Sequence, residues 1–245
     1  MKYAPYPYYK ASGIEWLGDV PETWSVGRVQ HNTNMKFSNV DKLTVEGEVS
    51  VLLCNYVNVY KNDYINSQLD FMQASATLAE IQDFRLQLGD VIITKDSESP
   101  DDIAIPAYVI ETVPNLICGY HLAVLRARPK KCEGKYLFYF FMSKLCRQQF
   151  ENQANGITRF GLSQRAIAKG WFIVPSLPEQ HAIAAYLDQE TAKIDALIAK
   201  QEQMITLLGE HRAALITAAV TGKIDVRRAV PSTTATTEGA LTNVR

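Results

Sequence analysis

The feature that most constrains this chain is an uninterrupted helical pattern from Ser176 to Gly222. Ser176 and Glu179 match the S-x-x-E capping box, and Pro178 suits an early helical position because it has no N–H to leave unpaired. Gly222 suits the position just after a helix. About 45 residues at roughly 1.5 Å each give a rod on the order of 65 Å long. The rest of so small a chain cannot cover such a rod, so we expect it to need a partner.

Apolar residues recur along this helix at the 3-4-3-4 spacing of a coiled-coil heptad. This row, here called the seam, contains Ile194, Leu197, Gln201, Met204, Leu208, His211 and Leu215, and is widened on one flank by Ile198 and Ile205. Polar groups in a seam cost stability but can fix register and orientation. Two alternatives stay open: the helix lies on its own domain, or His211 is simply solvated at the seam edge. The length favours pairing between helices.

Composition predicts one globular domain besides the helix. The 245 residues are 47% hydrophobic, which suffices for a core. We therefore expect an α+β protein with a mixed α/β domain, the long helix after it, and a loose C-terminal tail. The N-terminus lacks the apolar core of a signal peptide and no apolar run reaches 18 residues, so we expect a cytoplasmic protein that does not bind membranes.

The cysteines carry no recognisable chemistry. Cys54, Cys118, Cys132 and Cys146 form no C-x-x-C pair and have no histidine at ligand spacing. We expect buried free thiols rather than zinc ligands or disulfides, and no bound metal.

Positive charge is concentrated in one window of an otherwise acidic chain. Residues 126–169 hold 10 Lys and Arg against 2 Asp and Glu, whereas residues 1–125 hold 8 against 16 and residues 170–222 hold 3 against 6. Such a patch is the electrostatic footprint of a polyanion site. A solvated basic helix face remains an open alternative.

Local patterns predict how the domain is built. Runs of β-branched and aromatic residues predict strands at 49–60, 90–94, 103–110, 116–126 and 171–174, and helical spacing predicts one helix at 135–152 and a short helix starting near Ser163. Between these helices, residues 155–160 predict a glycine-containing loop.

Familiar catalytic patterns are absent. Thr221-Gly222-Lys223 resembles the end of a phosphate-binding loop, but Ile224 stands where the magnesium-binding hydroxyl belongs. Pro100-Asp101 with Glu111 hints at a nuclease carboxylate pair, but Val113 occupies the place of the expected catalytic lysine. No G-x-S-x-G, H-E-x-x-H or dinucleotide fingerprint is found. A binding surface is therefore favoured over a catalytic site.

The candidate binding residues are polar, basic or aromatic side chains next to predicted turns. Arginine can bind guanine bidentately, lysine and hydroxyls can bind phosphates, and exposed aromatic rings can pack on bases or sugars. Arg159, in a glycine-containing loop within the basic window, is the strongest single candidate. The set is Lys95, Ser97, Tyr120, His121, Thr158, Arg159, Arg165 and Lys169.

Four segments in order resemble the specificity subunit of type I restriction-modification enzymes. They are YKASGIEWLGDVPETW at 9–24, GDVIITKD at 89–96, GITRFGLS at 156–163 and PSLPEQHAIAAYLD at 175–188, with the long helix behind them. The resemblance spans about residues 9–226. The departure is length, because a complete family member carries two recognition domains and two spacer helices in one chain, and this chain has one of each.

The resemblance implies a target recognition domain at about 1–175 that reads one half of a bipartite DNA site and does no chemistry itself. It also implies a spacer and dimerisation helix at about 176–226, expected to pair as an antiparallel coiled coil, which leaves a flexible tail at 227–245. The implied partners are double-stranded DNA, methyltransferase subunits that use S-adenosylmethionine, and ATP-driven restriction subunits, whose participation is left open. No cofactor is expected on this chain. The half length has three open explanations: a natural half subunit, a truncation, or a piece of a phase-variable locus. A natural half subunit is expected to form a homodimer. Two alternatives remain open: a stand-alone dimeric DNA-binding regulator or decoy that sequesters partner subunits, and an unrecognised nuclease.

Overall fold

A five-stranded sheet forms the centre of the structure, a computed structural model that describes residues 4–227. Its strand order is β4-β12-β8-β10-β6, with bounds Thr33–Phe37, Leu122–Ala127, Asp90–Thr94, Pro106–Val109 and Tyr64–Ile65. Neighbouring strands are antiparallel except β10 and β6, which are parallel. A three-stranded sheet has the order β11-β5-β7, with bounds Leu116–Cys118, Val49–Cys54 and Met72–Ala76.

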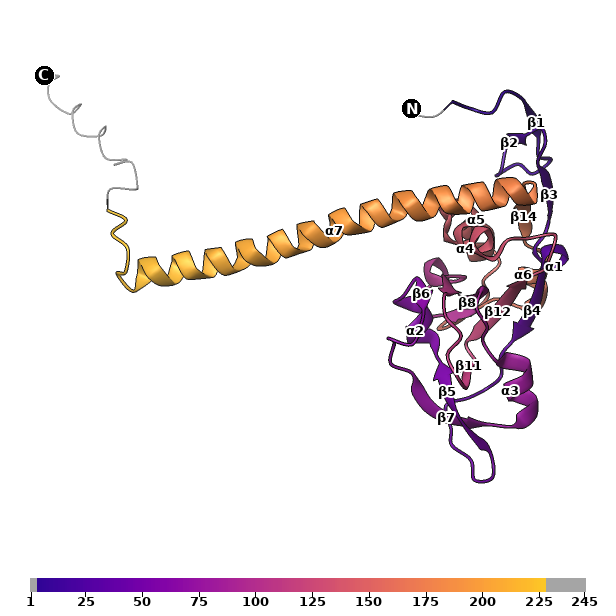
Figure 1. Cartoon of the computed structure of the whole chain (residues 1–245), viewed down its shortest axis with the longest axis horizontal. Helices are drawn as coiled ribbons and strands as arrows, with labels where there is room; N and C mark the ends of the chain where they lie inside the picture. Colours follow the sequence, from indigo (N-terminus) through magenta and orange to yellow (C-terminus); the bar gives the residue numbers. More distant parts are fainter. Residues whose placement is uncertain (1–3, 228–245) are drawn as a thin grey trace, which may run out of the picture. The chain divides into compact units, whose positions relative to one another are not determined.

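Three strand pairs and several helices complete the domain. The pairs are β1 with β2 (Tyr9–Ala11, Asp19–Pro21), β3 with β14 (Ser25–Arg28, Trp171–Val174) and β9 with β13 (Asp96–Ser97, Phe160–Gly161). The helices are α1 (Val29–Asn32), α2 (Tyr56–Tyr60), α3 (Leu78–Phe84), α4 (Gly134–Met142), α5 (Lys144–Glu151), α6 (Gln164–Lys169) and a 3₁₀ turn at Pro100–Asp102. Pairing of β3 with β14 joins the start of the domain to the segment directly before the long helix (Figure 1).

Strand β8 is buried on both faces of the central sheet. Successive side chains of a strand point to opposite faces. Val91 and Ile93 accordingly pack with the α4 and α5 aromatic residues, whereas Ile92 packs on the other face with residues of α2 and of β11. The sheet is thus the middle layer of the domain, and the loops at its edges are left to carry binding residues.

Two sequence predictions gave one element where the structure has two. The predicted strand at 49–60 ends at Cys54, because the Asn55 side chain accepts hydrogen bonds from the Val57 and Asn58 N–H groups and begins helix α2. The predicted helix at 135–152 is two helices, because Ser143 ends α4 in extended backbone and its hydroxyl caps α5 at the Cys146 N–H.

Other predictions located the element and missed part of its extent. The predicted strand at 103–110 is shortened to β10, and the predicted strand at 116–126 is split into β11 and β12 by the turn at Gly119. The strands at 90–94 and 171–174 and the short helix capped by Ser163 are confirmed.

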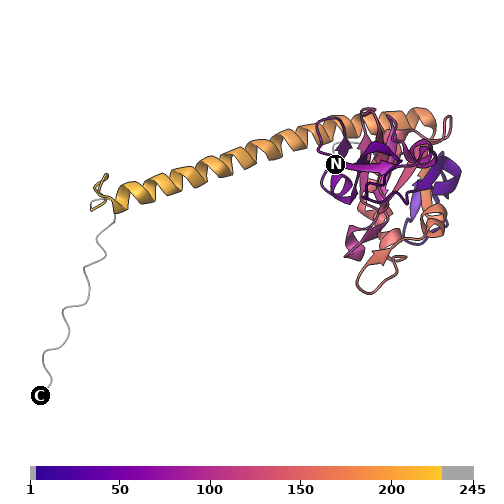
Figure 2. The same ribbon diagram turned by 90° about the horizontal axis from the view of Figure 1, so that it is seen from below.

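The long helix α7 runs from Leu177 to Val220, as the sequence predicts. Figure 1 and Figure 2 both draw it as one continuous helix. The Ser176 hydroxyl accepts from the Glu179 N–H at 3.4 Å, and the Glu179 carboxylate accepts from the Ser176 N–H at 3.2 Å, as the capping box requires. At the other end Gly222 has φ +70°, and the Lys223 N–H donates to the Ala218 carbonyl at 2.8 Å.

The chain divides into the units Met1–Asp188 and Gln189–Arg245, so the first three turns of α7 belong to the first unit. The predicted domain boundary after residue 175 stays a prediction. Nearly all of the predicted tail at 227–245 lies outside the described residues.

Buried polar contacts fix those first turns of α7 to the domain. The Trp24 indole N–H donates to Glu179 at 3.0 Å, and the hydrogen bonds from Ser176 and Trp24 lower the pKa of Glu179. Gln180 is fully buried: its Oε1 accepts from the Glu133 N–H at 2.9 Å, and its Nε2 donates to the Pro175 carbonyl at 3.0 Å. Asp188 accepts from the Tyr139 hydroxyl at 2.7 Å.

We predict that Gln180→Leu lowers the free energy of unfolding by about 2–4 kcal/mol, because a side chain of similar size leaves buried backbone groups without partners. Urea unfolding would measure this change. Gln203→Leu is the control, because Gln203 is exposed on the same helix and its replacement should change stability by less than about 0.5 kcal/mol. Equal effects of the two substitutions would contradict the role assigned to Gln180.

Candidate nucleic-acid interface

The loop that carries Arg159 is closed by backbone atoms. The Asn155 N–H donates to the Gly161 carbonyl at 3.1 Å, and the Gly161 N–H donates back at 3.0 Å. Gly156 has φ +155°, and a Cβ there would lie 1.8 Å from the Arg159 carbonyl oxygen, so only glycine fits. The loop presents Ile157, Thr158 and Arg159 to solvent. Within the described residues we find no ion pair or hydrogen bond of the Arg159 guanidinium.

A second exposed turn, Gly119–His121, joins β11 to β12. Its Gly119 N–H donates to the Cys54 carbonyl at 2.8 Å, and a Cβ on Gly119 would lie 2.9 Å from that oxygen. His121 Nδ1 lies 3.0 Å from an Asp96 carboxylate oxygen, and the Tyr120 and His121 rings are in contact, with centroids 3.6 Å apart. Asp96 belongs to β9, which pairs with β13 at the end of the Arg159 loop. The two turns are therefore linked through β9.

Helix α2 places two tyrosines beside these turns. Tyr56 and Tyr60 are one helical turn apart and stack with centroids 5.4 Å apart and an interplanar angle of 15°. The Tyr60 hydroxyl donates to Asp102 at 3.2 Å, and this hydrogen bond raises the pKa of Tyr60. The Tyr56 hydroxyl lies 3.3 Å from Ser97 Oγ. The hydroxyl contacts hold the two rings in a fixed orientation.

A hollow of about 300 Å³, here called the polar hollow, lies between α2 and the Arg159 loop. It is lined by Tyr56, Tyr60, Ser97, Glu98, Asp102 and Arg159. It therefore combines one guanidinium, two carboxylates and a stacked aromatic pair. These groups can donate to and accept from the polar edges of a planar ligand.

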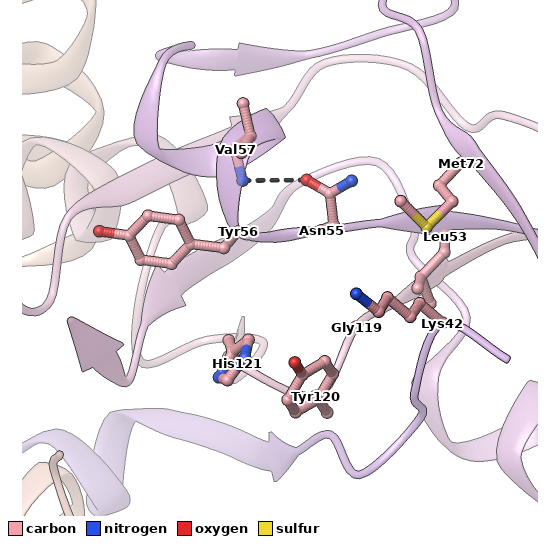
Figure 3. A pocket seen from close by; sticks show the side chains of 9 residues that line it. All are labelled: Lys42, Leu53, Asn55, Tyr56, Val57, Met72, Gly119, Tyr120 and His121. Atoms are coloured by element: carbon pink, nitrogen blue, oxygen red, sulfur yellow. Dashed lines mark hydrogen bonds between the residues drawn. The ribbon is translucent and has the colours of Figure 1, made fainter. Parts of the chain in front are cut away.

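An apolar pocket of about 200 Å³ lies on the other side of Tyr56 (Figure 3). Leu53 and Met72 supply apolar walls, and Figure 3 shows the Lys42 ammonium directed into the space between Asn55 and Tyr120. The full lining is Lys42, Leu53, Asn55, Tyr56, Val57, Met72, Gly119, Tyr120 and His121. The polar hollow and this pocket share Tyr56, so together they form one recessed strip of the domain surface.

The structure brings four of the eight predicted binding residues to this strip. Tyr120 and His121 line the apolar pocket, Ser97 and Arg159 line the polar hollow, and Thr158 precedes Arg159 in the exposed loop. Arg165 and Lys169 instead lie on α6 and line a separate hollow with Asn152, Gln153 and Asn155. Their functional role stays a prediction.

Two of the predicted residues are engaged within the fold. Lys95 Nζ donates to the Ser38 carbonyl at 2.9 Å, and Ser97 is only 3% exposed. These contacts give Lys95 and Ser97 a structural role in the turns next to the strip, and their binding role stays a prediction.

Sequence reasoning missed Tyr56, Tyr60 and Asp102, which complete the polar hollow. The sequence pattern predicts a strand that contains Tyr56 and Tyr60. Alternate residues of a strand share a face, so that prediction gives no reason to expect these two rings to stack as an i,i+4 pair on a helix. The signal that could have found them is Asn55, a favoured N-cap residue directly before them.

Part of the basic window has a structural role. Arg126 makes two hydrogen bonds of 2.7 and 2.8 Å to Asp90, whose side chain is 1% exposed. Arg128 Nε donates to the Thr33 carbonyl, and Lys135 pairs with Asp188 at 2.8 Å. These three cations are bonded within the fold, so the excess charge of the window overstates the charge free to bind a polyanion.

The predicted seam of α7 is exposed along its whole length. Its apolar members each expose between 51% and 68% of their surface, and Gln201 and His211 are exposed as well. Leu207, at 64%, extends the apolar row beyond the predicted set. An apolar row of this length marks a surface that another molecule covers.

Residues 4–227 contain neither a candidate metal site nor a candidate membrane-spanning helix. No group of three or more His, Cys, Asp or Glu side chains there could hold a metal ion. No helix in the same part of the chain is long and apolar enough to cross a membrane.

The comparisons with known proteins agree on one family and one fold. A family model described as "Type I restriction modification DNA specificity domain" matches residues 32–207, which include most of the domain and much of α7. A comparison with curated proteins found no match.

Two solved structures are similar over most of this chain. One comes from a study of complex assembly and conformational transition of the type I R-M system, with TM-score 0.63 and 17% identity over 82% of this chain and 47% of that chain. The other is the HsdS subunit from Thermoanaerobacter tengcongensis, with TM-score 0.55 and 18% identity over 79% of this chain and 42% of that chain. At these identities the likeness shows the fold, and this chain spans about half the length of either structure.

Proposed function

The chain belongs to the type I restriction modification DNA specificity family, and from this premise we propose that it is a non-catalytic DNA-specificity subunit. It reads one half of a bipartite site in double-stranded DNA. It pairs with a second copy through α7 as an antiparallel coiled coil, and the pair serves as a scaffold for methyltransferase subunits.

The observation that carries this proposal is the exposed apolar seam on a 44-residue helix, in a chain half the length of its structural relatives. A single copy leaves that seam in water. Two copies would bury it and would together supply two recognition domains and two long helices. The same assembly accounts for the uncovered helix.

Symmetry then constrains the target. Two identical chains joined by antiparallel helices are related by a two-fold axis, which reverses the direction in which the two domains meet DNA. The site should therefore be an inverted repeat whose halves are separated by base pairs that neither domain reads.

The recessed strip suits contact with base edges. Arginine pairs bidentately with the O6 and N7 atoms of guanine, and carboxylates accept from the cytosine amino group. Arg159 and the carboxylates of Glu98 and Asp102 line the same hollow, so we propose that it reads a G·C pair. Arg165 and Lys169, on the exposed side of α6, are proposed to contact phosphates.

The cofactors are proposed to bind the partner subunits that carry out the chemistry. S-adenosylmethionine is proposed to bind the methyltransferase partners, and ATP the restriction subunits if these join. Neither is proposed to bind this chain. A second candidate function, a decoy that sequesters methyltransferase subunits, rests on the same exposed seam and differs only in producing an inactive complex.

We predict that light scattering gives the mass of a dimer for the purified chain and a larger mass after a cognate methyltransferase subunit is added. The mixture should methylate DNA at an inverted-repeat site, which neither component methylates alone. A dimer that binds the methyltransferase without methylation would favour the decoy. A strict monomer would rule out pairing through α7.

We predict that Arg159→Ala relaxes sequence preference at one position of each half-site, because a bidentate arginine contributes about 1–3 kcal/mol of discrimination. A binding selection on randomised half-sites would measure it. Arg165→Ala is the matched control and should weaken binding to all sequences alike. If Arg159→Ala also weakens all sequences equally, Arg159 contacts a phosphate and the proposed reading of G·C is wrong.

We predict that removal of one heptad from the exposed part of α7 shortens the preferred spacer by roughly 3 base pairs, because the pair becomes about 10 Å shorter. Selection on sites with varied spacers would measure the change. Removal of three residues is the control, since it disrupts the phase of the seam and should abolish pairing. An unchanged spacer after the heptad deletion would contradict a rigid pair.

A further inference from the structure

We infer that two copies of α7 pair in one particular register, in which Gln201 of each copy faces His211 of the other. The two-fold axis then passes at the level of Thr206. This inference rests on the proposed dimer and specifies its interface.

The seam has two kinds of heptad position. One kind is occupied by Ile194, Gln201, Leu208 and Leu215, and the other by Leu197, Met204, His211 and Ala218. In an antiparallel coiled coil each residue of the first kind faces one of the second kind on the other helix. Allowed registers therefore differ by whole heptads, and the residue that faces Leu208 identifies each of them. The choices are Glu190, Leu197, Met204 and His211. A fifth register, with Leu208 facing Ala218, leaves the helix before Thr206 unpaired, because α7 ends at Val220.

Only one of these registers matches polar with polar and apolar with apolar. When Leu208 faces Met204, Leu215 faces Leu197, Ala218 faces Ile194 and Gln201 faces His211. When Leu208 faces Leu197, Gln201 faces Met204 and His211 faces Ile194. The remaining two registers place Leu208 itself against Glu190 or His211. An unmatched polar group in a seam loses its hydrogen bonds with water and gains none in return.

The flanks of the seam favour the same register. It places Ile205 beside Ile205 of the other copy and Leu207 beside Leu207, which would cover the exposed leucine outside the predicted seam. The register with Leu208 against Glu190 instead brings Lys200 beside Lys200, where like charges repel.

The extent of exposed helix gives an independent argument. In the inferred register Val220, the last residue of α7, lies level with Ala192 of the other copy. From Ala192 to Val220 every residue is exposed except Ala218 and Ala219, whereas Ala184 is buried and Leu187, Glu190 and Thr191 are half-buried. The register therefore pairs the whole exposed part of α7. A shift of one heptad toward the domain would bring Val220 level with Ala185, among residues that are already packed.

The facing polar residues can satisfy one another. The Gln201 amide carries both a donor and an acceptor, and a neutral imidazole offers one of each. The pair can therefore form a hydrogen bond in either tautomer of His211. Because the pair occurs twice, at equal distances from the two-fold axis, it fixes register and antiparallel orientation together.

Cysteine cross-linking tests the register directly. All four native thiols are buried, and burial raises the pKa of Cys54 and of Cys132 to about 12, so an added surface thiol should react selectively. Leu207→Cys brings two thiols to within about 3 Å of each other along the helix axis in the inferred register. Lys200→Cys, at the equivalent heptad position, separates them by about 18 Å.

Under mild oxidation in the full-length protein, Leu207→Cys should give a covalent dimer and Lys200→Cys should not. Cross-linking of Lys200→Cys, or of neither variant in a protein that still dimerises, would overturn the register and leave the proposed dimer intact. A monomeric wild-type protein would overturn the proposed dimer, and the register with it.

A double-mutant cycle tests the polar pair. Gln201→Ala and His211→Ala should each weaken self-association roughly tenfold, because each leaves its partner unsatisfied in the seam. The double variant should be weakened by much less than the product of the single effects, since the residues face each other. Dimer dissociation constants from sedimentation equilibrium would measure both. Effects that simply multiply would show that the two side chains do not meet, and would overturn the inference.

Discussion

The rest of this molecule depends on how the first turns of α7 are fixed to the recognition domain. The Gln180 side chain accepts a hydrogen bond from the Glu133 N–H and donates one to the Pro175 carbonyl. The Glu179 carboxylate accepts one from the Trp24 indole, which links the start of α7 to the N-terminal part of the domain. A helix can set the distance between two reading surfaces only if its beginning does not move relative to its own domain. Buried hydrogen bonds suit that task better than an exposed salt bridge, which contributes little and is screened by salt.

The central sheet also determines which elements can supply residues to the recessed strip. Because β8 is covered on both faces, the middle of the sheet offers no surface to a ligand, and the recessed strip is lined from turns at the sheet's edges and from helix α2. Those turns are not independent: Lys95 hydrogen-bonds through its backbone to both the His121 turn and the segment after Arg159. Candidate binding residues that are far apart in sequence are thereby held at fixed spacing.

Most features set by neighbours in sequence are predictable, with the start of α2 as the exception, whereas features set by distant partners are not. The capping box at Ser176 and the glycine at 222 located α7 correctly, because helix ends are determined by a few adjacent residues. The Tyr56 and Tyr60 pair was missed because a β-branched sequence pattern masked a cap at Asn55. A count of charges along the sequence also cannot show that Arg126 forms an ion pair with Asp90, which lies 36 residues away.

The Arg159 loop has a consequence for how such a protein can change over evolutionary time. Its ends are joined by main-chain atoms of Asn155 and Gly161, and its only strict demand on sequence is the glycine at 156. Residues at its tip can therefore be exchanged without loss of the contacts that close it. Under the proposed function, single substitutions at this tip would give new sequence preferences while the folding of the domain remains intact. In a symmetric pair each such substitution is duplicated at once, so both halves of a target would drift together.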